Sequence, residues 1–265
     1  MARLTPLAPS SSPPWGWAAG GALAGLAVAV LLFAPARWLA VAVQQASSGH
    51  LLLAQPRGTV WNGSAQLLLA GGAGSRDAAA LPGRVTWQLR PGWRGWQAAL
   101  DAPCCTPQAL QLQATPRWGG MQLALADGQS QWPAAMLAGL GTPWNTIQAD
   151  GMLSLSTRGL SVTLVQGRLA MEGQARLEAL GLASRLSTVR PMGSYRLTLK
   201  GGPTATLQLA TLEGSLQLTG SGRWVGSRLH FEGAASAAPG RVDALSNLLN
   251  IIGRRDGARS IITVG

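Results

Sequence analysis

Residues 168–178 read R-L-A-M-E-G-Q-A-R-L-E, and this stretch decides the fold class. Apolar or small residues occupy its odd positions, and polar residues occupy most of the even ones. A period of two is typical of a β-strand with one buried face and one face in water. Residues 228–235 and the longer run 212–224 alternate in the same way. These segments predict half-buried strands.

The leucines change phase just before the longest of these runs. Leu207 and Leu209 stand at odd positions, whereas the leucines from Leu212 onward stand at even ones. Because one inserted residue reverses the faces of a strand, we expect a bulge or tight turn near Ala210–Gly214. On the apolar face that follows, we expect three side chains to be buried: Leu216, Leu218 and Trp224.

Turn residues such as Asn62-Gly63, Pro82-Gly83 and Asp127-Gly128 separate many further candidate strands. Short connections favour antiparallel meanders, because parallel strands need longer crossovers. Only two segments, Ala134–Leu140 and Val242–Ile252, favour helices. We therefore predict an all-β fold: an antiparallel, curved meander-type sheet or a sandwich, with minor helices. The further strand candidates are 58–70, 84–90, 109–114, 121–127, 151–157, 160–166, 194–200 and 259–264.

The N-terminal region is apolar and carries no charge between Arg3 and Arg37. A helix of about 20 residues, at about 1.5 Å per residue, spans the core of a bilayer. Trp15–Ala34 has this length, and tryptophans near both ends suit the membrane interfaces. The alternative is a cleavable signal peptide, because Ala34-Pro35-Ala36 loosely resembles a cleavage site. The long apolar stretch and the scarcity of basic residues before it favour a retained transmembrane helix.

The short N-terminal tail favours a cytoplasmic N-terminus, which places the bulk of the chain in the periplasm of a bacterium. We accordingly predict a single-pass protein of the inner membrane. The expected parts are a cytoplasmic tail (1–14), a transmembrane anchor (15–38), a juxtamembrane stalk (39–57) and a periplasmic β-rich domain (58–265).

The composition argues against catalysis and against nucleic-acid binding. The net charge is +11, but only 12% of residues are charged and the arginines are dispersed rather than clustered. The two histidines, His50 and His230, have no accompanying set of zinc ligands, and the ten acidic residues are scattered. Phosphate-binding and dinucleotide-binding motifs are absent from the sequence. We predict a protein that is not an enzyme, with no catalytic, cofactor-binding or metal-binding residues.

Cys104 and Cys105 are the only cysteines, and they are adjacent. Neighbouring Cα atoms are about 3.8 Å apart, which is below the usual range for a disulfide. The alternatives are a rare vicinal disulfide, an intermolecular bond or two buried thiols. The C-x-x-C spacing of redox proteins is absent, so a structural role is favoured.

Several motifs, in their order and spacing, resemble one family: type II secretion system protein N, also called general secretion pathway protein N. The most specific is A-L-S-N-L-L-N-I-I-G-R-R-D-G, residues 244–257. Trp61 and Trp144 belong to two of the shorter motifs, and core packing is the commoner role of such tryptophans. The shorter motifs are G-T-V-W-N-G (58–63), L-P-G-R-V-T-W (81–87), G-T-P-W-N (141–145) and G-S-Y-R-L (193–197).

The resemblance implies an accessory component of the machine that exports folded periplasmic proteins across the outer membrane. Its expected partners are other components of that system, namely the inner-membrane platform and the secretin. The resemblance also suggests kinship with AsmA-like β-proteins, whose curved sheets are associated with lipid passage. The alternative function is therefore lipid handling or envelope maintenance. A continuously apolar and open sheet face would favour lipid, whereas a face filled by side chains would favour a scaffold.

Overall fold

The computed structural model describes residues 15–165, 168–226 and 228–265, which form two compact units divided after Ala34. The described part of the first unit contains one helix, α1 (Trp15–Leu32), which is apolar throughout and buries none of its residues. Its length and composition suffice to cross a membrane. The expected tail, residues 1–14, lies outside the described residues.

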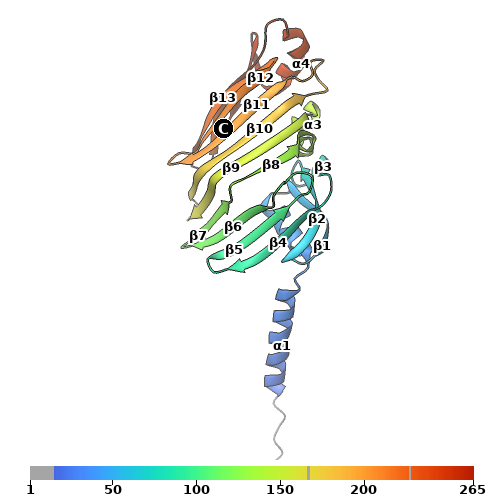
Figure 1. Cartoon of the computed structure of the whole chain (residues 1–265), viewed down its shortest axis with the longest axis vertical. Helices are drawn as coiled ribbons and strands as arrows, with labels where there is room; N and C mark the ends of the chain where they lie inside the picture. Colours follow the sequence, from blue (N-terminus) through green and yellow to red (C-terminus); the bar gives the residue numbers. More distant parts are fainter. Residues whose placement is uncertain (1–14, 166–167, 227) are drawn as a thin grey trace, which may run out of the picture. The chain divides into compact units, whose positions relative to one another are not determined.

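The second unit is built on one 16-stranded sheet in which every described strand pair is antiparallel (Figure 1). Most neighbours in the sheet are also consecutive in sequence, while β3 and β8 pair beside the main path. The predicted antiparallel meander is thus confirmed, as a single sheet rather than a sandwich.

The strands, in chain order, are β1 (Leu51–Gly58), β2 (Asn62–Ala70), β3 (Ala78–Ala80), β4 (Val85–Gly92), β5 (Gly95–Asp101), β6 (Leu110–Arg117), β7 (Gly120–Leu125), β8 (Gly128–Pro133), β9 (Asp150–Val165), β10 (Arg168–Ala183), β11 (Gly193–Gly202), β12 (Thr206–Gly214), β13 (Leu216–Val225), β14 (Arg228–Ala237), β15 (Arg254–Asp256) and β16 (Arg259–Val264). The helices of this unit are α2 (Ala36–Ala46), the 3-10 helix η1 (Ala134–Leu140), α3 (Trp144–Ile147) and α4 (Val242–Ile252).

The sheet begins earlier in the chain than expected. The segment 39–57, expected as a stalk, contains most of α2 and nearly all of β1. Strand β1 pairs with β2, with Leu53 opposite Leu67, and is therefore part of the sheet. Helix α2 packs Leu39 against this part of the sheet, because Ala36 and Leu39 lie in one apolar cluster with the buried Trp87.

Two candidate strands, 151–157 and 160–166, belong to one long strand, β9, which ends at Val165; residue 166 lies outside the described residues. The register of β9 with β10 shifts twice, once between Arg158 and Ser161 and once between Asp150 and Met152. Gly159 has a φ of 56°, a conformation that favours glycine and is typical of a bulge. Gly159, which lies between the two candidate strands, therefore marks a bulge within one strand.

The predicted irregularity near Ala210–Gly214 is confirmed. Between β11 and β12, Ser194 pairs with Glu213 and Tyr195 with Thr211, which leaves Leu212 as the extra residue. The run 212–224 is nevertheless not one strand, because β12 ends at Gly214 and β13 begins at Leu216. Beside the bulge, the Thr211 hydroxyl accepts a hydrogen bond from the Leu218 amide (2.6 Å) and donates one to its carbonyl (2.9 Å).

The main core lies at one end of the strands in the second half of the sheet, where residues of η1, α3 and α4 pack with residues of β9 to β14. Helix η1 also contacts β2 and β3. Figure 1 shows α3 and α4 beside these strand ends. Leu216 is buried there, as predicted. Leu218 and Trp224 are only partly buried, so the prediction was wrong for these two. Helix α4 and its neighbours cover the start of β13, near Leu216. Trp224 is the second-last residue of this strand and so lies away from that cover.

Tyr195 is the only tyrosine and provides a probe of this core. Its side chain is buried, and its hydroxyl donates a hydrogen bond to the Leu216 carbonyl (3.1 Å). Burial raises the pKa of Tyr195, because the phenolate loses its hydration in an apolar core.

We expect no tyrosinate absorbance near pH 10, the ordinary pKa, while the protein stays folded. The pKa of Tyr195 is higher in the folded than in the unfolded protein, so the protonated phenol contributes to the stability of the fold. This contribution is complete below pH 10 and is lost as the pH rises further. Ultraviolet absorbance and circular dichroism followed together should show tyrosinate appearing with unfolding. A normal transition at pH 10 in a folded protein would contradict the prediction, and Tyr195→Phe provides the spectroscopic control.

Candidate functional site

The described residues contain no group of three or more His, Cys, Asp or Glu side chains arranged to hold a metal ion. His230 is exposed on β14, as expected for the polar face of its strand, and His50 precedes β1.

Two of the motifs, residues 58–63 and 81–87, connect the first strands of the sheet. Trp87 is buried, and its Nε1 donates a hydrogen bond to the Val60 carbonyl (3.0 Å). The Arg84 guanidinium donates to the carbonyls of Gln55 (2.8 Å) and Ser64 (3.0 Å). These contacts link β1, β2 and β4, so the role of both residues is structural.

Of the two tryptophans in question, Trp61 stacks on Trp96 with ring centroids 5.6 Å apart. Trp144, in α3, is exposed. The next residue, Asn145, donates a hydrogen bond from its side-chain amide to Asp77 (3.0 Å). This motif therefore connects α3 with the loop before β3 while leaving one aromatic ring at the surface.

The C-terminal motif forms α4 and its exit. Leu245, Leu248 and Leu249 are fully buried against the main core. The Ser260 hydroxyl donates a hydrogen bond to the Leu249 carbonyl (2.6 Å), which connects the helix to β16. The most specific motif of the resemblance thus forms the helix that encloses the main core.

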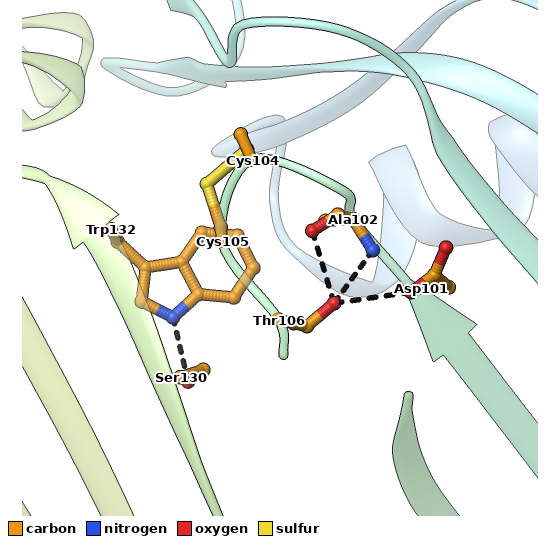
Figure 2. Close-up of a disulfide and its surroundings, with 7 residues drawn as sticks. All are labelled: Asp101, Ala102, Cys104, Cys105, Thr106, Ser130 and Trp132. Atoms are coloured by element: carbon orange, nitrogen blue, oxygen red, sulfur yellow. Dashed lines mark hydrogen bonds between the residues drawn. A yellow bond between two sulfur atoms is a disulfide. The ribbon is translucent and has the colours of Figure 1, made fainter. Parts of the chain in front are cut away.

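Of the three alternatives for the cysteines, the structure has the vicinal disulfide between Cys104 and Cys105 (Figure 2). Cys105 is buried in an apolar cluster against which Trp132 packs, whereas Cys104 is exposed. The neighbouring Thr106 hydroxyl accepts a hydrogen bond from the Ala102 amide (2.8 Å) and donates one to its carbonyl (3.0 Å). The packing and these bonds support a structural role for the pair.

One face of the middle of the sheet carries exposed apolar side chains that no helix of this unit's described residues covers. The register places Trp96, Leu123 and Val162 in one row across β5, β7 and β9, and Met121 and Leu164 in the next. On the same face of the first strands, Trp87 is covered by α2. We call the uncovered part the open face; its exposed members are 44–51% accessible and comprise Trp96, Met121, Leu123, Leu164 and Leu169.

A contiguous exposed apolar surface of this kind marks a site for a protein or a membrane. Helix α2 covers the neighbouring part of this sheet face, around Trp87, whereas the residues of the open face are exposed. The open face is therefore the candidate functional site of the sheet.

The two strands that end the main path of the sheet, β1 and β15, are poorly suited to adding a strand from a partner. Strand β1 has a register shift between Ala54 and Arg57, where Gln55 has a φ of 48° and Pro56 lacks an amide hydrogen. At the other edge, β15 has only three residues, all exposed and all charged. Bulges, prolines and charges are devices that prevent edge pairing. Binding through the faces or the hairpin ends is favoured instead.

The comparison with known families gives one match. The family described as "Type II secretion system (T2SS), protein N" matches residues 49–262, from just before β1 into β16. No curated protein and no solved structure matches the chain. The matched range covers the whole sheet except the last residues of β16, and it includes all the motifs quoted above. The chain belongs to the type II secretion system protein N family.

Proposed function

We propose that this chain is a non-enzymatic inner-membrane component of the type II secretion system that supports export of folded periplasmic proteins by protein–protein contacts. The match of residues 49–262 to the protein N family carries the proposal. It is supported by an apolar surface suited to binding, and by motif residues that connect strands and helices rather than form a reactive centre.

In the proposed arrangement, α1 crosses the inner membrane, the N-terminus is cytoplasmic and the sheet lies in the periplasm. The apolar length of α1 supports a membrane span. The Cys104–Cys105 disulfide supports an oxidising compartment, because disulfides persist in the periplasm and are rare in the cytosol.

We propose that the open face binds another component of the secretion system, either the inner-membrane platform or the secretin. An apolar face can bind a protein or a lipid, but membership of a secretion family favours a protein. The two end strands of the main path, β1 and β15, are unsuited to strand pairing, so partner contact through side chains of the open face is favoured over strand addition there.

Deleting the protein should cause exoproteins to accumulate, folded, in the periplasm while translocation across the inner membrane continues. The wild-type chain should restore release. Leu123→Asp should restore it poorly, because it places a charge on the open face. Gln111→Asp is the matched control, because Gln111 is exposed on β6 and its side chain lies on the sheet face opposite the open face.

Cross-linking from the open face should recover a platform or secretin component. An alkaline phosphatase fusion after Gly265 should be active if the sheet is periplasmic. Normal exoprotein release after deletion, together with phospholipid bound to the purified protein, would reject the proposal in favour of lipid handling.

A further inference from the structure

Two neighbouring β-hairpins end in fully exposed tryptophans. The tip between β4 and β5 reads G-W-R-G (92–95), and the tip between β6 and β7 reads R-W-G-G (117–120). Trp93 is 106% exposed and Trp118 is 98% exposed. Because β5 pairs with β6, the hairpins are neighbours, and equivalent positions on them lie about 10 Å apart. We call them the tryptophan hairpins.

An indole ring has a large apolar surface and is costly to leave in water. The other tryptophans of this part of the sheet avoid that cost in part or in full: Trp87 is buried and Trp61 stacks on Trp96. Trp93 and Trp118 therefore differ from their neighbours in having no cover within the described chain, and a ligand outside the chain would provide it.

The tips hold their side chains on short, constrained turns. Gly95 has a φ of 139° and Gly119 a φ of 75°, values that favour glycine. A Cβ on Gly95 would overlap the Ala114 carbonyl of the neighbouring strand, so the two hairpins pack closely. The exposed rings project from a connected pair of hairpins rather than from long loops.

The charge at these tips is entirely positive. Arg94 follows one tryptophan and Arg117 precedes the other. Between Asp77 and Asp127 the sequence contains a single acidic residue, Asp101, and it lies at the opposite end of β5 from the tip. An anionic ligand would therefore meet no repelling carboxylate from either hairpin.

A groove of about 600 Å³ lies between the two tips and is lined by both arginines. Its polar lining includes Gln113 and Gln122, and the Arg117 Nε donates a hydrogen bond to Gln122 Oε1 (3.0 Å). A guanidinium positioned in this way can bind phosphate oxygens through its remaining N–H groups. The groove matches the size and charge of a phospholipid headgroup better than those of an apolar side chain.

Exposed apolar side chains continue from the tips onto the open face. Met121 follows the second tip, and Trp96 follows the first. The hairpins thus have tryptophans at the end, arginines in the groove and apolar side chains on the other face. This arrangement suits the boundary between lipid headgroups and acyl chains, where tryptophan is enriched and arginine meets phosphate.

We propose that the tryptophan hairpins dock on the surface of an anionic phospholipid bilayer. Trp93 and Trp118 enter the headgroup region, and Arg94 and Arg117 bind lipid phosphates. A protein partner is less suited to this edge, because two narrow tips offer far less than the roughly 800 Å² per partner of a standard interface. The chain also carries its own candidate membrane helix, so a weak contact with lipid would be strengthened by high effective concentration.

This inference does not depend on the proposed role in secretion, and its test uses no secretion assay. The full-length protein would be reconstituted in bilayer discs of phosphatidylcholine, with or without phosphatidylglycerol, containing lipids brominated on the acyl chain near the headgroup. Bromine quenches nearby tryptophans, so the quenched fraction of fluorescence reports indoles in the interface. Trp15 and Trp17 of α1 contribute equally to all variants.

We expect quenching to be greater with phosphatidylglycerol than without it, and the difference to fall at least twofold in Trp93→Ala/Trp118→Ala. Arg94→Gln/Arg117→Gln should lose the dependence on phosphatidylglycerol while retaining both indoles. Trp144→Ala is the matched control, since it removes an exposed tryptophan from α3 and should preserve the difference.

Both replaced tryptophans are exposed, so the thermal midpoint of the double variant should equal that of the wild type, which separates lipid contact from misfolding. Equal quenching of the wild type and Trp93→Ala/Trp118→Ala in anionic discs would overturn the proposal. Cross-linking of the tips to a protein partner, without lipid-dependent quenching, would likewise overturn it and assign this edge to protein binding.

Discussion

Replacing Trp87 with alanine is expected to lower the free energy of unfolding by about 3–5 kcal/mol, the range for removing a buried aromatic side chain. The indole is 3% exposed and packs with Ala36, Ala65 and Leu89, so its loss leaves a cavity between α2 and the sheet. Its Nε1 also donates to the Val60 carbonyl (3.0 Å), and the substitution removes that hydrogen bond from the turn between β1 and β2.

The cavity left by Trp87→Ala cannot be filled easily by movement of β2, which lies against the indole ring. Gly63 lies so close to Trp87 that an added Cβ would come within 2.4 Å of the indole Cζ2 atom. The backbone of β2 is therefore already in contact with the ring, and the strand is held by its pairing with β4. Limited relaxation is the condition under which large-to-small changes cost most.

Thermal or urea unfolding of the full-length protein in detergent, followed by far-ultraviolet circular dichroism, would measure this effect. Trp93→Ala is the matched control, because Trp93 lies just beyond β4 and is fully exposed. Its thermal midpoint should equal that of the wild type. An unchanged midpoint for Trp87→Ala would show that α2 does not close this part of the core.

The alternation of apolar and polar residues predicted strands correctly where one face of the strand is apolar and the other polar. Residues 168–178 and 228–235 belong to β10 and β14 as expected. Strand β1 begins L-L-L-A and contains Pro56, so neither face can be distinguished from sequence. Strand β5, residues 95–101, has alanines at two adjacent positions, so its two faces also cannot be distinguished from sequence. Both strands are defined by their pairing partners rather than by their own pattern.

The binding surfaces were less predictable than the strands, because alternation identifies a face without showing what covers it. Trp87 and Trp96 lie on the same face of neighbouring strands, yet α2 covers only the first. The tryptophans at the hairpin tips gave a possible signal, since G-W-R-G and R-W-G-G combine turn residues with a large apolar side chain and a cation. The position of the two tips side by side required the strand order of the sheet.

The helix 242–252 was predicted with its observed bounds, because its leucines recur at helical spacing and a glycine follows it. The same spacing explains why it closes the core: Leu245, Leu248 and Leu249 fall on one face and are completely enclosed. A stretch shared with the family thus has a structural explanation that needs no contact with a partner.

Leu248→Ala is accordingly expected to destabilise the protein by about 2–5 kcal/mol, through lost burial and the cavity that remains. Leu248 is 1% exposed and shares a core with Tyr195 and Leu216, which the hydrogen bond between them holds in place. The helix itself is fixed at both ends, since the Ser187 hydroxyl donates to the Ala244 carbonyl (3.3 Å) and that of Ser260 to Leu249 (2.6 Å). It therefore cannot shift far to fill the space.

Ile251→Ala in the same helix is the control, because Ile251 is exposed and alanine favours a helix, so it should change the stability by less than about 1 kcal/mol. Urea unfolding monitored by circular dichroism would compare the two variants directly. If the core at this end is one cooperative unit, Leu248→Ala should also lower the pH at which tyrosinate appears, because Tyr195 ionises only when that core opens. Equal stability of the two variants would show that α4 adds little to the core, and tyrosinate appearing at an unchanged pH would show that Leu248 and Tyr195 are not coupled.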